Sequence, residues 1–211
     1  MARKTDRRHR QGDESRHAIL EATLAIAAER GYDGTTVALV QEATRLPASS
    51  IYWHFGSKDQ LLAATLEHSY RSWRATAPTW VAATEPDDLS ERIEKRFQRA
   101  AQVLTTSPQF WSLGLLLTLQ QRVKEPAARR LYADVRKETE VAVRDWWATV
   151  LAPEAIEADP GLTTRLARFY MMLMDGLFLQ VRSSASKDFK RLVSLMSQGL
   201  GRHLESLGVA S

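Results

Sequence analysis

The chain contains no cysteine among its 211 residues. This absence excludes disulfide bonds, a thiolate nucleophile, iron–sulfur clusters and zinc sites built from cysteine. Long apolar runs are missing too. The best stretch, from Phe169 to Val181, contains Asp175 and Gln180 and falls short of the roughly 20 residues that cross a bilayer. The N-terminus is charged, without the apolar segment of a secretory signal. We therefore expect a soluble, cytoplasmic protein with no membrane partner.

The motifs of common enzyme classes are also missing. The sequence has no HExxH, GxSxG, GxGxxG or Walker A pattern. Its five histidines are scattered along the chain without the spacing of a metal site: His9, His17, His54, His68 and His203. We therefore predict that the protein is not an enzyme, with no catalytic residues, no metal site and no cofactor.

The composition is otherwise that of a globular protein, and its positive charge is unevenly distributed. Hydrophobic residues make up 44% of the chain and charged residues 26%, so it can bury a core. The net charge is only +4. The first ten residues, however, contain a single acidic residue and five basic ones: Arg3, Lys4, Arg7, Arg8 and Arg10. Such a segment is typical of an arm that binds a polyanion, and equally of a solvated tail.

Helical periodicity runs along the whole sequence, and no strand pattern interrupts it. Between Ser15 and Arg30 the apolar residues fall on one helical face, and Gly31 follows at the position of a helix-ending glycine. A break near residues 76–88 is marked by Pro78 and Pro86. We predict an all-α fold of about nine helices, four short to medium and then five long.

Residues 36–55 have the spacing of a helix–turn–helix. Thr36 is a suitable N-cap for a helix to about Thr44, the segment 45–47 breaks it, and residues 48–55 form a second short helix. Ile51 and Phe55 are spaced to face the core. The outer face of the second helix then holds Ser49, Ser50, Tyr52, Trp53 and His54. Spacing alone also fits an ordinary helical hairpin with aromatic residues in its core.

Two segments resemble the TetR family of bacterial transcriptional regulators. They are ERGYDGTTV at residues 29–37 and LPASSIYWHFGSKDQLL at residues 46–62. Specific motifs cover roughly residues 15–65, and the rest of the chain matches only in its helical pattern. The resemblance implies a homodimer that binds double-stranded DNA. It implies a basic flexible arm at 1–14, a three-helix DNA-binding domain at 15–62 with a fourth helix to about 75, and a larger ligand-binding and dimerisation domain at 76–211.

The resemblance also assigns DNA-contacting residues. Ser49, Ser50 and Trp53 match positions that read or border the major groove, and Tyr52 and His54 match a phosphate-contacting pair. Further phosphate contacts fall at helix N-termini, where backbone N–H groups and the helix dipole favour an anion. These residues are Thr36 and Lys58. Within the arm, the residues expected to enter the minor groove are Arg3, Lys4, Arg7 and Arg8.

The turn departs from the family pattern at two positions. Arg45 stands where glycine is usual, and a left-handed conformation there would cost about 1 kcal/mol or more. Pro47 replaces the usual capping serine and is predicted at the first position of the recognition helix. Neither change removes the fold, but both affect the turn that orients the second helix.

The last two-thirds of the chain is rich in large apolar residues. Most such residues belong to a core, but the resemblance also implies an effector pocket suited to an apolar ligand. The candidates for it are Trp111, Tyr132, Trp147, Phe169 and Met172. Apolar stripes on the last two helices predict a dimer interface, unless they pack only within their own subunit. Its candidates are Leu166, Leu173, Leu177, Leu192, Met196 and Leu200.

Together these features predict a ligand-responsive repressor. It would bind a palindromic operator as a dimer and be released by a small, largely apolar effector. The alternative is a helical small-molecule carrier with a non-functional helix–turn–helix.

Overall fold

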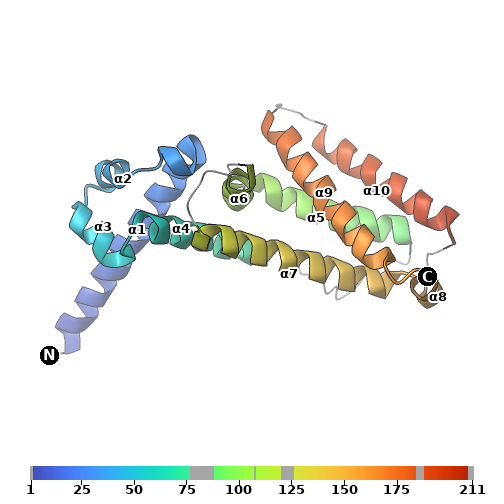
Figure 1. Ribbon diagram of the computed structural model, residues 1–211, viewed down its shortest axis with the longest axis horizontal. Helices are drawn as coiled ribbons and strands as arrows, with labels where there is room; N and C mark the ends of the chain where they lie inside the picture. The colour runs from blue at the N-terminus through green and yellow to red at the C-terminus, as the bar shows by residue number, and fades with distance from the viewer. Residues whose placement is uncertain (1, 77–87, 107, 120–125, 184–187, 209–211) are drawn as a thin grey trace. The chain divides into compact units, whose positions relative to one another are not determined.

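The computed structural model describes the backbone of residues 2–76, 88–106, 108–119, 126–183 and 188–208, and side chains from residue 10 onward within these ranges, Thr76 excepted. These residues form ten helices (Figure 1). In order they are α1 (Ala2–Gly34), α2 (Val37–Thr44), α3 (Ala48–Phe55), α4 (Lys58–Thr76), α5 (Leu89–Thr106), α6 (Gln109–Leu119), α7 (Pro126–Val150), α8 (Pro153–Ala158), α9 (Leu162–Ser183) and α10 (Phe189–Ser206). The all-α prediction is confirmed, and short α8 is the helix it lacked. None of the described helices is long and apolar enough to cross a membrane.

The chain forms two compact units that are not continuous in sequence. The first contains residues 1–75 and 109–134, and the second contains residues 76–108 and 135–211. The sequence prediction assigned all of 76–211 to one C-terminal domain. In the structure α6 and the start of α7 group with the N-terminal unit, because α6 packs against α1. The break predicted around Pro78 and Pro86 lies outside the described residues.

Helix α1 begins much earlier than expected. The sequence predicted a flexible arm over residues 1–14, whereas the backbone is helical from Ala2. Arg, Lys, Gln and Glu dominate this segment, and all four have high helix propensity. At the other end Gly31 has φ 70° and ψ −178° and interrupts the helix before its last turn. Glycine adopts this backbone readily, so its predicted role as the helix-ending residue is confirmed.

The helix–turn–helix is held by caps and by one left-handed residue. The Thr36 hydroxyl accepts a hydrogen bond from the Leu39 N–H at 3.2 Å, as expected for an N-cap. Arg45 ends α2 with φ 57° and ψ 19°, so the left-handed conformation considered for this turn is present. Pro47 is the N-cap of α3, one position before the predicted one, and its side chain makes no capping bond. Ser57 caps α4 by accepting from the Gln60 N–H at 3.2 Å.

A small apolar core fixes α2 and α3 against α1 and α4. Its buried residues come from all four helices: Ile19, Leu20, Val40, Ile51, Phe55 and Leu61. Ile51 and Phe55 lie four residues apart on α3 and are both buried, as their spacing predicted. Because these two side chains fix the rotation of α3 about its axis, the opposite side of the helix faces solvent.

In the second unit α5 packs against both α9 and α10 (Figure 1). Phe97 of α5 meets Tyr170 of α9 edge to face, with ring centroids 5.2 Å apart. Burial raises the pKa of the Tyr170 hydroxyl far above its ordinary value, although nearby Arg96 acts in the opposite direction. On α10, a Cβ at Gly201 would overlap Ser90 of α5, so the glycine permits the close approach of the two helices.

Candidate nucleic-acid interface

The outward face of α3 presents polar and aromatic side chains to solvent. Trp53 is 79% exposed and Tyr52 is 50% exposed. Ser49 is exposed as well, whereas Ser50 and His54 are half-buried. Exposed tryptophan and tyrosine are unusual on a protein surface with no partner. The structure therefore brings together on one face the five α3 residues that the sequence assigned to DNA contact.

His54 lies at the edge of this face, among charged and aromatic neighbours. Its ring meets the Trp53 ring edge to face at 4.7 Å between centroids. Burial lowers the pKa of His54 below its ordinary value, and the charge of Arg16 lowers it further, while Asp13 acts in the opposite direction. The Arg16 guanidinium itself lies over the Phe55 ring, 5.4 Å from its centroid. At neutral pH the free protein thus holds a mainly neutral His54 beside a fixed positive charge.

Two open grooves flank the turn between α2 and α3. One is lined by residues of α1 and α3, among them Ser15, Ser49, Ser50 and His54. The other is lined by α2 and the turn, including Gln41, Glu42 and Arg45. Leu46 borders both grooves. Hydroxyl groups in one groove and an arginine in the other provide donors that suit a phosphate backbone.

The remaining predicted DNA contacts lie at helix beginnings. Thr36 is exposed in front of α2, and Lys58 is the first residue of α4 and half-buried. Both stand where a helix dipole attracts an anion. Of the basic N-terminal residues, Arg10 is exposed on α1. The side chains of the others lie outside the described part of the chain: Arg3, Lys4, Arg7 and Arg8.

Comparison with known proteins agrees with this geometry. Residues 19–65 match the family described as "Bacterial regulatory proteins, tetR family", which is the segment that forms the core and outer face described above. The HTH-type transcriptional regulator BetI of Burkholderia thailandensis is 32% identical over 172 residues, covering 78% of this chain and 80% of that protein. The chain belongs to the TetR family. The predicted resemblance is confirmed, and this TetR-family protein is a DNA-binding transcriptional regulator, not an enzyme.

Two solved structures share the fold. A TetR transcriptional regulator from Chloroflexus aurantiacus aligns with a TM-score of 0.72 at 21% identity, over 93% of this chain and 96% of that one. The multidrug binding protein EbrR, solved in complex with imidazole, aligns with a TM-score of 0.58 at 20% identity, over 89% of each chain. At these identities the comparison with both proteins establishes the architecture.

The five predicted effector-binding residues of the TetR-family chain do not form one group. Trp111 and Tyr132 lie in the first unit, with ring centroids 6.3 Å apart. Trp147 is buried in the second unit beside Trp146. Phe169 and Met172 are exposed on α9. The sequence selects these five residues by their apolar character. The position of each residue on its helix decides which way its side chain faces, and the five face different surroundings.

The rings around Trp111 and Tyr132 form a larger aromatic cluster that the sequence did not reveal. It comprises Tyr70 and Trp73 of α4, Phe110 and Trp111 of α6, and Tyr132 of α7. Trp73 stacks on Phe110 at 5.5 Å, and Phe110 meets Tyr132 at 5.6 Å. Tyr132 packs directly onto Gly114, where a Cβ would overlap its ring. Since three helices far apart in sequence contribute, periodicity within one helix could not predict the cluster.

The six predicted interface residues, five leucines and one methionine, also differ in burial. Leu166, Leu177 and Leu200 are buried within the subunit, and the other three are half-buried. The exposed apolar residues of these helices are their neighbours: Phe169, Met172 and Leu179 on α9 and Leu195 on α10. Gly176 and Gly199 are exposed beside them. Half of the residues expected to face a partner thus belong to the subunit's own core, and the exposed apolar residues are their neighbours on the same helices.

Proposed function

We propose that this TetR-family protein is a ligand-responsive repressor that binds a palindromic operator as a homodimer in the cytoplasm. The observation that carries the proposal is the outer face of α3, where Tyr52 and Trp53 are exposed while Ile51 and Phe55 fix the helix in place. In this arrangement α3 enters the major groove. Ser49 and Ser50 approach base edges, and Tyr52 and His54 contact phosphates.

The basic start of α1 adds an electrostatic contribution to the same interface. Arg3, Lys4, Arg7 and Arg8 precede the helical turns whose residues line the groove beside α3. Phosphate neutralisation by such residues supplies much of the affinity for DNA and makes it salt-dependent. Thr36 and Lys58 hold further phosphates at the starts of α2 and α4.

Dimerisation uses the outward row of α9 and α10. Met172 is 60% exposed and Leu195 is 69% exposed, and isolated subunits rarely leave several such side chains on neighbouring helices in water. Two copies of the pair would form an isologous four-helix interface. Leu173, Leu192 and Met196, which are half-buried, would lie at its margin.

The effector acts through the aromatic cluster. Trp111 meets Trp73 of α4, and Tyr132 contacts both Trp111 and Phe110. Phe110 in turn meets Tyr70 and Trp73 of α4, the helix whose first turn carries Lys58. A small, largely apolar effector that inserts among these rings would displace α4 and thereby the DNA-binding helices. The multidrug binding protein EbrR, which shares the fold, is solved with bound imidazole. This likeness supports a small-molecule site in the present chain.

Selection of bound sequences from a random duplex pool, at two salt concentrations, tests the proposal. We expect a palindrome whose enrichment falls steeply with salt.

Ser50→Ala should change the selected bases, whereas Ser72→Ala, at an exposed serine on α4, should leave them unchanged. Tyr52→Phe combined with His54→Ala should weaken binding to every sequence and flatten its salt dependence. Folded protein that enriches no sequence at low salt would instead favour the carrier function.

A further inference from the structure

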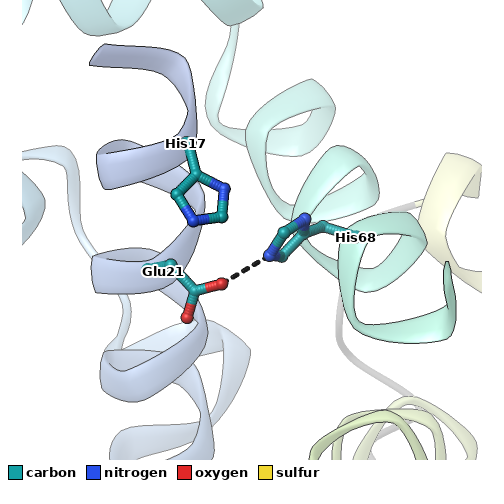
Figure 2. A group of neighbouring side chains, drawn as sticks. All are labelled: His17, Glu21 and His68. Carbon is teal, nitrogen blue, oxygen red and sulfur yellow. Dashed lines mark hydrogen bonds and ion pairs between the residues drawn. The ribbon is translucent and has the colours of Figure 1, made fainter. Parts of the chain in front are cut away.

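The structure brings two histidines and a glutamate together between α1 and α4 of the first unit. His17 and Glu21 are one helical turn apart on α1, and His68 comes from α4. Each offers a ligand atom, and the three atoms all lie within 4.8 Å of one another. Figure 2 shows the two imidazole rings and the carboxylate pointing toward one another between the two helices. From this geometry we propose a binding site for Zn²⁺ formed by His17, Glu21 and His68.

The distances are those of a site that needs only side-chain rotation to close on a metal. The His68 Nε2 and the Glu21 Oε1 are 2.5 Å apart, and the His17 and His68 rings meet edge to face at 5.3 Å between centroids. Zn²⁺ bonds of about 2.0–2.2 Å to nitrogen and oxygen place tetrahedral ligand atoms roughly 3.3 Å from one another. The separation of the His68 and Glu21 atoms is below that value, and the three ligand atoms all lie within 4.8 Å of one another. Because His17 and Glu21 are exposed, rotation of their side chains can bring the ligand atoms to the required spacing.

The donor set selects the type of metal. Two imidazoles and one carboxylate suit Zn²⁺ and related transition metals better than Mg²⁺ or Ca²⁺, which prefer oxygen ligands. Three protein ligands leave a fourth position for water. The cluster is accessible from solvent, because the Glu21 side chain is 53% exposed and that of His68 is 24% exposed. A metal ion can thus enter without unfolding the unit.

The position of the site gives metal binding a structural consequence. Residues 17 and 68 enclose α2 and α3 in the sequence, so a bound ion would join the two helices that bracket the helix–turn–helix. Directly beside the ligands, Ile19 and Leu20 on α1 and Leu66 and Ser69 on α4 are buried. The ligands therefore project from helix segments that are already fixed. An ion bound only by the folded unit stabilises it by mass action.

The test uses the full-length protein without a polyhistidine tag, freed of metal by a chelator. Zn²⁺ is titrated by calorimetry in competition with a chromophoric chelator, and Co²⁺ is added separately for its visible absorption. We expect one ion per chain and a rise in the thermal midpoint on adding Zn²⁺. Because the chain has no cysteine, no thiolate site can account for such binding.

Three single variants and one control decide the result. His17→Gln, Glu21→Gln and His68→Gln should each weaken Zn²⁺ binding more than about tenfold, and His68→Gln should abolish the Zn²⁺-induced rise in thermal midpoint. Each variant is compared with itself without metal, since His68→Gln also removes the hydrogen bond to Glu21. His203→Gln, at an exposed histidine on α10, should bind like the parent. Absence of binding, or parental affinity in all three ligand variants, would overturn the proposal, and neither result depends on DNA binding.

Discussion

At the scale of single residues, the turn of the helix–turn–helix contains a local strain. Arg45 is the one non-glycine residue with positive φ in the described chain. A side chain in the left-handed region costs roughly 1–2 kcal/mol, and its surroundings must supply that energy. In the same turn Leu46 packs against the core, and the Arg45 N–H donates to the Gln41 carbonyl at 2.8 Å. These interactions hold Arg45 in its unfavourable conformation.

Replacing this residue should therefore stabilise the protein. We expect Arg45→Gly to raise the free energy of unfolding by about 1 kcal/mol, somewhat less than the relieved strain because glycine loses more backbone entropy on folding. Chemical denaturation monitored by circular dichroism measures the change. Gly56→Ala is the opposite control, since Gly56 has φ 73° and an added Cβ would overlap the Gln60 side chain. A destabilised Arg45→Gly protein would show that the arginine side chain makes compensating interactions.

His54 gives a pH dependence to stability. Its pKa in the folded protein is lower than its ordinary value, with burial as the main cause. The unfolded chain therefore binds more protons as the pH falls through about 6.5, and stability falls with it. We expect the free energy of unfolding to decrease between pH 7.5 and pH 5.5, and His54→Gln to reduce that decrease. An unchanged pH profile in the variant would assign the dependence to other groups.

DNA binding should depend on pH in the opposite direction. A phosphate near His54 favours the charged imidazole and raises its pKa, so the protein takes up a proton when it binds DNA. Operator affinity should increase as the pH falls from 7.5 to 6, by up to about tenfold per pH unit for each His54 that is protonated on binding. Fluorescence anisotropy with parent and His54→Gln proteins measures this effect. Identical pH profiles would exclude His54 from phosphate contact.

At the scale of helices, local signals in the sequence predicted much of the first unit. Three such signals predicted α2 and α3, and all three are present in the structure. They are the Thr36 cap, the breaking turn at 45–47 and the spacing of Ile51 and Phe55. The start of α1 was missed, although the helix propensity of its residues is a local signal for it. The grouping of α6 with the first unit was not predictable this way, because only tertiary packing decides which unit α6 joins.

The same difference between local pattern and tertiary packing explains why only some of the predicted interface residues are available to a partner. Helical periodicity identifies an apolar stripe but not what covers it, and Leu166, Leu177 and Leu200 are covered by the subunit itself. The three residues of the proposed Zn²⁺ site are a case in which tertiary packing creates a cluster that no local pattern indicates. His17 and Glu21 have the four-residue spacing of a helical ligand pair, but His68 is far away in sequence. Only the packing of α1 beside α4 brings it to them.

The outward row of α9 and α10 should control the oligomeric state. We expect Met172→Lys combined with Leu195→Lys to yield monomers, because two charges from each subunit would be buried at a self-complementary interface. Sedimentation velocity measures the state, and operator affinity should fall with dimer loss. Leu119→Lys is the matched control, since Leu119 is 70% exposed on α6 of the first unit. A double variant that remains dimeric would place the interface elsewhere.

At the scale of the whole molecule, regulation is a coupling free energy between two sites, and it acts equally in both directions. An effector that lowers operator affinity by a given factor must itself bind more weakly, by the same factor, when operator is saturating. A ligand with equal affinity for the free and DNA-bound forms would shift nothing. The aromatic cluster provides a direct readout, because Trp73 and Trp111 lie within it and their fluorescence reports on an inserted ligand.

We therefore expect that a small apolar compound found by tryptophan fluorescence will weaken operator binding. Tyr132→Leu should reduce the affinity for that compound and leave operator affinity without it unchanged, since Tyr132 belongs to the cluster and not to the α3 face. Trp147→Phe serves as control, because Trp147 is buried in the other unit and should leave the response unaltered. An equal loss of affinity for the compound in both variants would mean that the effector does not bind at the cluster. If saturating operator left the affinity for the compound unchanged, binding at the cluster would not be coupled to DNA at all.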